Sequence, residues 1–232
     1  MFTKYSKETV TFLQELSHNN SKEWFDANRL IYDTHLLGRN KEFVIEMGEH
    51  LQALRPEVKF IPKVGGSLFR INRDTRFSKN KSPYKTHFGI FFWEGVGKKM
   101  ENPGFYFHVE LHKMMTGVGF YKFSKRVLAG YRKYIMDDGN AKALSSILEA
   151  LEAKGFTIGN KGYKRTPKGM DKASPYVELY LFDGLYAGVE MPHPSWMFEV
   201  SIVDELFAIY ERALPLQEWM VAMMKTIPAE DT

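Results

Sequence analysis

The sequence predicts an α+β fold, with a mainly antiparallel β-sheet (a meander) and α-helices packed on at least one of its faces. Apolar residues recur at helical spacing towards both ends of the chain, whereas hydrophobicity alternates with a period of two between residues 67 and 121. Short connections with Gly, Pro and Asn separate the alternating stretches, which favours antiparallel pairing. There is no repeat, low-complexity tract or linker, so we expect a single domain over residues 1–232.

The N-terminal third, residues 6–55, carries an apolar pattern typical of helices. Ser6 is the expected N-cap of a first helix, because a serine side chain can accept hydrogen bonds from free amides at a helix start. Residues 22–54 predict a second helix, and Asn20, with a glutamate three residues later, is its expected N-cap. Gly38 is expected to kink or divide this helix, because glycine is a poor helix former.

The central part of the chain, residues 67–121, predicts four strands. They are Ser67–Arg73, His87–Glu94, Gly104–His112 and Met115–Tyr121. The elements predicted after them are helices at about Lys125–Met136 and Ala141–Lys154, a glycine- and lysine-rich loop at Gly159–Lys172, a strand at Leu185–Met191 and a helix at about Ile202–Lys225.

The composition excludes several classes of chemistry. The chain has no cysteine, which rules out disulfides, thiolate metal sites, iron–sulfur clusters and cysteine nucleophiles. Its N-terminus lacks the apolar stretch of a signal peptide, and no segment has the roughly 18 apolar residues of a membrane span. We therefore expect a cytoplasmic protein with no membrane partner.

Positive charge is concentrated in two segments, although the chain has a net charge of only +4. The first basic segment, Arg70–His87, holds six Lys or Arg residues and one Asp, and the second basic segment, Gly159–Lys172, holds five and one. The rest of the chain is net acidic, so the clustering indicates an anionic partner. The candidate anion-binding residues are Arg70, Arg73, Arg76, Lys79, Lys81, Lys85, Lys164, Arg165 and Lys168.

Three interpretations of this charge stay open. The cations can bind a small anionic ligand such as a phosphate ester or a carboxylate, because arginine offers a planar pair of donors to such groups. They can bind nucleic acid, with Phe77, Tyr84 and Tyr163 as interleaved stacking residues. They can also pair with the protein's own carboxylates in a structural or interaction protein that has no ligand. The oligomeric state is not predicted.

Two expectations about the first basic segment follow from its charges. Asp74 should accept hydrogen bonds from a neighbouring arginine or from turn amides, because it lies within so basic a run. At least one of Arg70, Arg73 and Arg76 should then have no carboxylate partner and point into a concavity. We also expect the two basic segments to lie together and form one positive surface.

The third predicted strand alternates most cleanly. Tyr106, His108 and Glu110 fall on one face, opposite apolar residues. His87, on the preceding strand, can share this face in a meander. His87, His108 and Glu110 are therefore the candidate catalytic residues, with the polar side of an ordinary half-exposed strand as the alternative. No spaced metal motif, P-loop, dinucleotide fingerprint or nucleophile elbow is present, so we predict no metal and no cofactor.

Four sequence elements resemble a known family. They are Asn20–Phe25 (NSKEWF), Arg70–Gly89 (RINRDTRFSKNKSPYKTHFG), Gly104–Glu110 (GFYFHVE) and Lys164–Gly169 (KRTPKG). In this order they are similar to an uncharacterised bacterial and fungal family known as domain of unknown function 2461. The resemblance implies a single α+β domain. It implies no reaction, because the family has no assigned activity.

Overall fold

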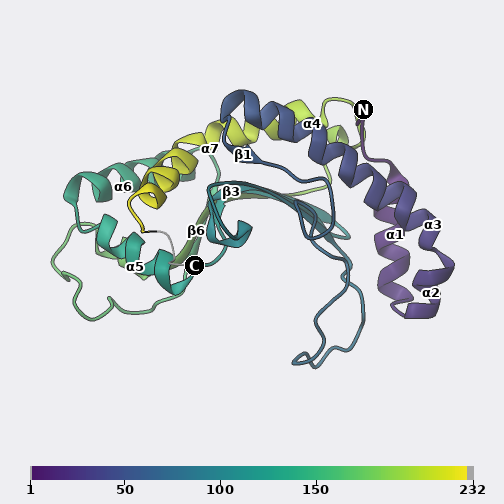
Figure 1. The fold of residues 1–232 in the computed structure, drawn as a ribbon, viewed down its shortest axis with the longest axis horizontal. Helices are drawn as coiled ribbons and strands as arrows, with labels where there is room; N and C mark the ends of the chain where they lie inside the picture. Colours follow the sequence, from purple (N-terminus) through teal and green to yellow (C-terminus); the bar gives the residue numbers. More distant parts are fainter. Residues whose placement is uncertain (1, 229–232) are drawn as a thin grey trace. The chain divides into compact units, whose positions relative to one another are not determined.

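The structure, a computed structural model, describes residues 2–228 and confirms the α+β class (Figure 1). Within these residues, six strands form one antiparallel sheet in the order β1-β2-β3-β4-β6-β5. The consecutive neighbours β2, β3 and β4 form the predicted meander. The strands are Val58–Lys59 (β1), Phe88–Glu94 (β2), Gly104–Val109 (β3), Lys113–Phe120 (β4), Thr157–Lys161 (β5) and Phe182–Pro192 (β6).

Seven α-helices and a wide helical turn accompany the sheet in the described part of the chain. None of these helices is both long enough and apolar enough to cross a bilayer. The helices are Lys7–His18 (α1), Lys22–Ala27 (α2), Arg29–Ile31 (α3), Arg39–Leu54 (α4), Lys125–Tyr134 (α5), Asp138–Ala153 (α6) and Ile202–Lys225 (α7), and the wide turn is a π-helix at Tyr32–Gly38.

The start of the second predicted helix differs from the expectation. Its N-cap is Ser21, whose hydroxyl accepts a hydrogen bond from the Trp24 amide at 3.2 Å, and the predicted cap Asn20 was wrong. The helix also ends early at Asn28, whose side chain donates to the Trp24 carbonyl at 2.9 Å. An Asn side chain that competes for a helix carbonyl favours an end at this point. The predicted helix is thus interrupted at Asn28, and it is also divided at Gly38 as expected, because the π-helix ends there and α4 begins at the next residue.

The strand predicted at Ser67–Arg73 is not continuous. Its first part pairs with β2, where the Phe69 amide donates to the Gly89 carbonyl at 3.1 Å. Beyond Arg70 the backbone leaves β2 and pairs instead with residues 83–85. The prediction failed because alternation describes both pairings equally well and does not identify the partner strand.

The second basic segment is less irregular than predicted. Its first residues belong to β5, which pairs antiparallel with β6 and has a register irregularity between Gly159 and Lys161. Gly159, Asn160 and Lys161 are uncommon in strands, so the residue preferences of this stretch did not indicate a strand. The other elements are confirmed within a few residues. Gly155, the expected cap after α6, has a left-handed backbone with φ of 84°.

The described chain divides into two compact units, each built from three separate segments. Within the described residues, the first comprises residues 2–92, 106–116 and 190–208, and the second comprises residues 93–105, 117–189 and 209–228. Strands β2, β3, β4 and β6 contribute residues to both units, so no single linker divides the chain.

An aromatic core fills the first unit. The Phe107 ring of β3 lies 5.2 Å from the Phe43 ring of α4 and 6.0 Å from the Phe88 ring of β2. Tyr5 joins the same cluster, and its hydroxyl donates to the Asn40 side chain at 2.8 Å. This packing fixes one face of β3 on the helices and leaves Tyr106 and His108 on the opposite face.

Candidate acid–base site and basic ribbon

The polar face of β3 carries a hydrogen-bonded chain of three side chains. The Tyr106 hydroxyl lies 2.7 Å from His108 Nδ1, and His108 Nε2 lies 3.1 Å from Glu110 Oε1. The His108 side chain is only 12% exposed, whereas that of Glu110 is 44% exposed. We call these three residues the relay. His108 and Glu110, which were predicted to share one face of this strand, are thus in direct contact.

The partners of His108 define its tautomer. A carboxylate only accepts, so His108 Nε2 carries the proton, and unprotonated Nδ1 accepts from the Tyr106 hydroxyl. Burial lowers the pKa of His108 below its usual value, while the Glu110 charge opposes this shift. The imidazole is therefore neutral at pH 7 and can receive a proton at Nδ1.

His87 extends the relay from the neighbouring strand. Its ring stacks on that of His108, with 4.5 Å between the centroids and 25° between the planes. Burial lowers the pKa of His87 to about 4. The nearby His108, Lys85 and Arg73 act in the same direction, and the Glu110 charge opposes the shift. The sequence grouped His87 with His108 and Glu110, and the structure brings all three together.

Gly89 of β2 makes room for the relay. A Cβ atom at this position would lie 2.7 Å from the Tyr106 hydroxyl oxygen and 3.3 Å from the Phe69 ring. Thr116 of β4 supports the same strand by donating to the Tyr106 carbonyl at 3.0 Å. Sequence reasoning missed both residues, because a glycine inside a strand signals a close approach without naming the group that approaches.

His193 holds the turn that follows the relay. Its Nε2 donates to the Glu110 carbonyl at 2.9 Å and lies 3.2 Å from the Lys113 carbonyl. Lys113 also forms an ion pair with Glu190 at 2.9 Å. His193 therefore has a structural role.

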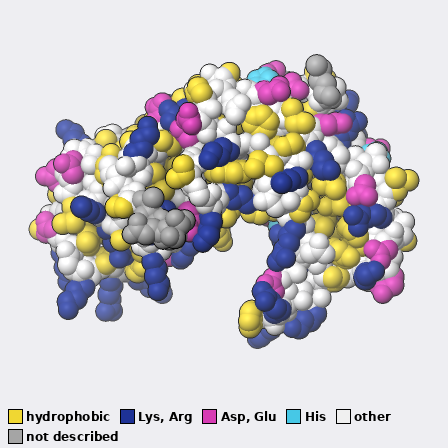
Figure 2. Space-filling view, viewed as in Figure 1, with side chains coloured by type: hydrophobic (Ala, Val, Ile, Leu, Met, Phe, Trp, Pro, Cys, Tyr) yellow, Lys and Arg dark blue, Asp and Glu magenta, His cyan; other side chains and the backbone are white. Residues whose placement is uncertain are grey.

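The first basic segment forms a ribbon that projects away from helix α4 (Figure 1). The Arg73 amide donates to the Pro83 carbonyl at 2.8 Å, and the Lys85 amide donates to the Ile71 carbonyl at 2.8 Å. Residues 74–82 form the tip beyond these bonds. Lys and Arg side chains gather along the ribbon, with acidic and hydrophobic groups near its end (Figure 2).

The N-terminal helices anchor this ribbon at its base. The Asn20 side chain donates to the Tyr84 carbonyl and accepts from the Tyr84 amide, both at 3.0 Å. The Tyr84 ring stacks on Phe25 with 4.1 Å between centroids and is only 7% exposed. Tyr84 is therefore not the stacking surface for bases that its place among cations suggested. Two of the motifs that carry the family resemblance contact each other here.

The cations of the ribbon have different partners. Asp74 accepts two hydrogen bonds from the Arg76 guanidinium, at 3.0 and 2.6 Å, and one from the Arg76 amide, which confirms its expected role. Arg73 instead contacts Ser78 Oγ at 3.3 Å and the Ser82 carbonyl at 3.4 Å.

Lys85 and Arg70 complete the base of the ribbon. Lys85 Nζ donates to the Arg70 carbonyl at 2.9 Å, and burial, followed by the Arg70 charge, lowers the pKa of Lys85. Among the described residues, no carboxylate forms an ion pair with Arg70, Arg73 or Lys85. The prediction that at least one arginine lacks a carboxylate partner is therefore confirmed for this part of the chain.

The second basic segment has a different local environment. Lys161 pairs with Glu178 at 2.9 Å, and the Arg132 guanidinium carbon lies 4.7 Å from the centroid of the Tyr163 ring. The remaining candidate cations are exposed, namely Lys164, Arg165 and Lys168. The two basic segments belong to different units, so their union in one positive surface stays a prediction.

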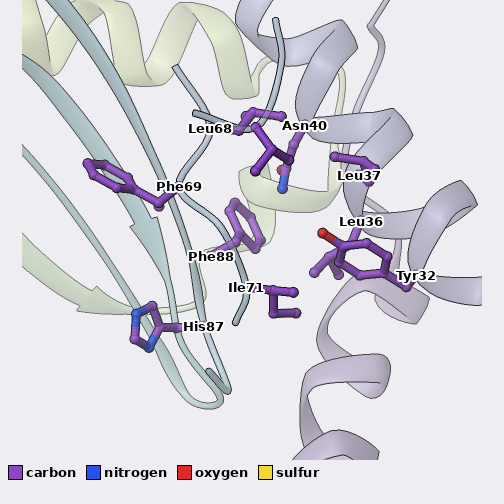
Figure 3. A pocket seen from close by; sticks show the side chains of 11 residues that line it. Tyr32, Leu36, Leu37, Asn40, Leu68, Phe69, Ile71, His87 and Phe88 are labelled. Atoms are coloured by element: carbon purple, nitrogen blue, oxygen red, sulfur yellow. The ribbon is translucent and has the colours of Figure 1, made fainter. Parts of the chain in front are cut away.

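A small pocket adjoins the relay strands in the first unit. Phe88 and Ile71 point towards the helical residues Tyr32 and Leu36, while His87 points away from them (Figure 3). The free volume for water-sized molecules is about 20 Å³, room for little more than one water. None of the three ribbon arginines lines it, so the pocket is not the concavity predicted for them.

The site has a limited chemical repertoire. Its relay can move a proton, and the base of the ribbon can attract an anion. In the described residues, no three His, Asp or Glu side chains are grouped so that they could hold a metal ion.

Comparison with known proteins assigns a family. The model of a family described as "Conserved hypothetical protein (DUF2461)" matches residues 8–219. No curated protein and no solved structure gave a match. The matched range contains all four motifs, the relay and both basic segments, and the chain belongs to the DUF2461 family.

Proposed function

We propose that the protein binds a small anionic ligand, a phosphate ester or a carboxylate, at the base of the ribbon and uses the relay for acid–base chemistry on it. The observation that carries the proposal is the proximity of cations without ion-pair partners to neutral histidines. Lys85 and Arg73 lie close enough to His87 for their charges to lower its pKa. An anion between these groups would offset their mutual repulsion.

Arg73 is the strongest candidate ligand contact. Among the described residues, its guanidinium meets only neutral oxygen atoms, from Ser78 and Ser82, at 3.3 and 3.4 Å. Both contacts are long for charge-assisted hydrogen bonds, so a carboxylate or phosphate oxygen would be a better acceptor. Arg76, three residues further along the chain, is already paired with Asp74. Both arginines are positively charged, but Arg73 is available to bind a ligand anion and Arg76 is not.

The direction of the relay favours base catalysis by Tyr106. When the phenol oxygen accepts a proton from a ligand hydroxyl or a bound water, the phenol's own proton can pass to His108 Nδ1. The Glu110 carboxylate, 3.1 Å from Nε2, stabilises the resulting imidazolium. Cations at the base of the ribbon would stabilise negative charge that develops on the ligand.

Titration with inorganic phosphate at pH 7, followed by calorimetry and by NMR of the histidine rings, tests the binding part. We expect Arg73→Ala to weaken binding by about 10- to 100-fold, because a charged hydrogen bond contributes about 1.5–3 kcal/mol. Arg76→Ala is the matched control and should bind as the wild type does. Bound phosphate should also raise the pKa of His87, since a nearby anion favours the imidazolium.

Arg73→Lys keeps the positive charge but loses the planar pair of guanidinium donors. This conservative variant distinguishes a loss of phosphate binding from a loss of folding. No phosphate binding to the wild type, or equal weakening in the Arg73 and Arg76 variants, would overturn the proposal. The acid–base part is tested with aryl phosphate and aryl carboxylate esters. Tyr106→Phe and His108→Gln should retain phosphate binding and lose turnover, and turnover that survives both changes excludes the relay.

A further inference from the structure

We infer that the tip of the ribbon binds single-stranded nucleic acid, with Phe77 as the platform on which a base stacks. The inference does not depend on the anion site at the base. Phe77 is 94% exposed, the highest fraction among the exposed large hydrophobic residues of the described chain. Burying such a ring is worth about 1.5–3 kcal/mol. The free protein lacks this stabilisation because the ring is exposed at the end of a projecting ribbon. A partner that buries the ring can provide it.

The tip presents Phe77 in an ordered setting. The Asp74 carboxylate holds both the amide and the guanidinium of Arg76, the residue before Phe77. Lys81 Nζ donates to the Thr75 carbonyl at 2.9 Å and so joins the two sides of the tip. Asn20 and Phe25 hold the base through Tyr84. A partner therefore meets an aromatic ring whose supporting loop needs little further ordering.

The charge around the ring favours a polyanion. Lys79 and Lys81 are both exposed, and the Arg76 guanidinium carbon lies 5.8 Å from the centroid of the Phe77 ring. Residues 74–82 carry three cations and one carboxylate. An aromatic face for a base with lysines for the adjacent phosphates is the combination that binds single strands without sequence preference.

Other partners fit this tip less well. The bases of a duplex are stacked on each other, so a single protruding ring cannot stack on them unless one is extruded. Insertion into a lipid bilayer would carry the Asp74–Arg76 ion pair, Ser78 and Asn80 out of water together with the ring, at a cost that one phenyl group does not offset. Single-stranded nucleic acid places only the ring in an apolar contact and leaves the polar groups hydrated.

Fluorescence anisotropy of a labelled oligothymidylate and the matching oligouridylate tests the inference with the full chain. Phe77→Ala should weaken binding by about 10-fold or more, because stacking of one base contributes about 1–3 kcal/mol. Phe77→Trp should bind at least as tightly as the wild type. Leu30→Ala, a change at another exposed apolar residue (78% exposed), is the matched control and should have no effect.

The salt dependence gives a second readout. Replacing both Lys79 and Lys81 with alanine should reduce the slope of log affinity against log salt by about 1.4, because each phosphate contact on a single strand contributes about 0.7. Equal oligonucleotide affinity of the wild type and Phe77→Ala, or no binding by the wild type at low salt, would overturn the inference. So would a Phe77-dependent attachment to phosphatidylglycerol vesicles without oligonucleotide binding. Phosphate binding that survives Phe77→Ala separates this result from the anion-site test.

Discussion

The two basic segments are similar in charge and different in what surrounds them. The first is held at its base by Asn20 and by the Phe25–Tyr84 stack, and it adjoins the partly buried His87, whose ring stacks on His108. The second begins as strand β5 and has one ion pair, between Lys161 and Glu178, while its other candidate cations are exposed. A count of cations therefore locates the positive charge along the sequence. The chemistry of a site depends instead on which cations have ion-pair partners and which side chains lie beside them.

The same lesson holds within the first segment. Asp74 neutralises Arg76, so the arginine nearest to Phe77 is already occupied. Arg73 has only neutral partners, and its charge reaches His87. Base and tip are thus two different surfaces on one ribbon. For this reason the anion proposal and the nucleic-acid proposal need different variants to test them.

The largest expected effect is a difference in stability between variants of the aromatic residues Tyr84 and Tyr163, one from each basic segment. Tyr84→Ala should lower the free energy of unfolding by about 3–5 kcal/mol, as other buried aromatic truncations do. Tyr163→Ala should lower it by about 1 kcal/mol or less, because Tyr163 is 37% exposed and mainly covers Arg132. Urea denaturation of both variants measures the difference. Similar losses would show that the first segment is not anchored as described.

A smaller effect is expected at Gly89, beside the relay. Gly89→Ala should cost about 1–3 kcal/mol, because the new methyl group would overlap the Tyr106 hydroxyl, 2.7 Å from its position. Tyr106→Phe removes that oxygen, so the double variant should lose less stability than the sum of the two single changes. Strict additivity in this double-mutant cycle would contradict the proposed close approach.

The last expected effect is a pH dependence that the partly buried His87 confers on the first unit. The pKa of folded His87 is about 4, below the value of about 6.5 in an unfolded chain. The unfolded state therefore binds more protons between these values, and stability should fall as the pH falls through this window. One group can contribute at most about 1.4 kcal/mol per pH unit, and screening by solvent at the partly exposed His87 brings its contribution well below this limit.

Thermal or urea denaturation between pH 7 and pH 4 measures this dependence. His87→Gln should flatten it, whereas His112→Gln, a change at an exposed histidine, should leave it as in the wild type. An equally steep loss of stability in His87→Gln and the wild type would assign the dependence to other groups.

The sequence by itself determined the α+β class, the meander and most element positions, because hydrophobic periodicity records which face of each element is buried. It also placed His108 and Glu110 on one face, since strand alternation has a fixed period of two, and it allowed His87 to share that face in a meander. Asp74 as a carboxylate partner within the basic run was predicted from charge alone, and the structure confirms it.

Only the tertiary structure decided the contacts between residues far apart in the chain. Asn20 was predicted to cap a helix and instead binds the Tyr84 backbone, 64 residues away. Gly89 had no predicted role until the Tyr106 hydroxyl came within 2.7 Å of where its Cβ would be. Local patterns report spacing along the chain, whereas strand register and side-chain pairing depend on the whole packed arrangement, and these set which groups meet.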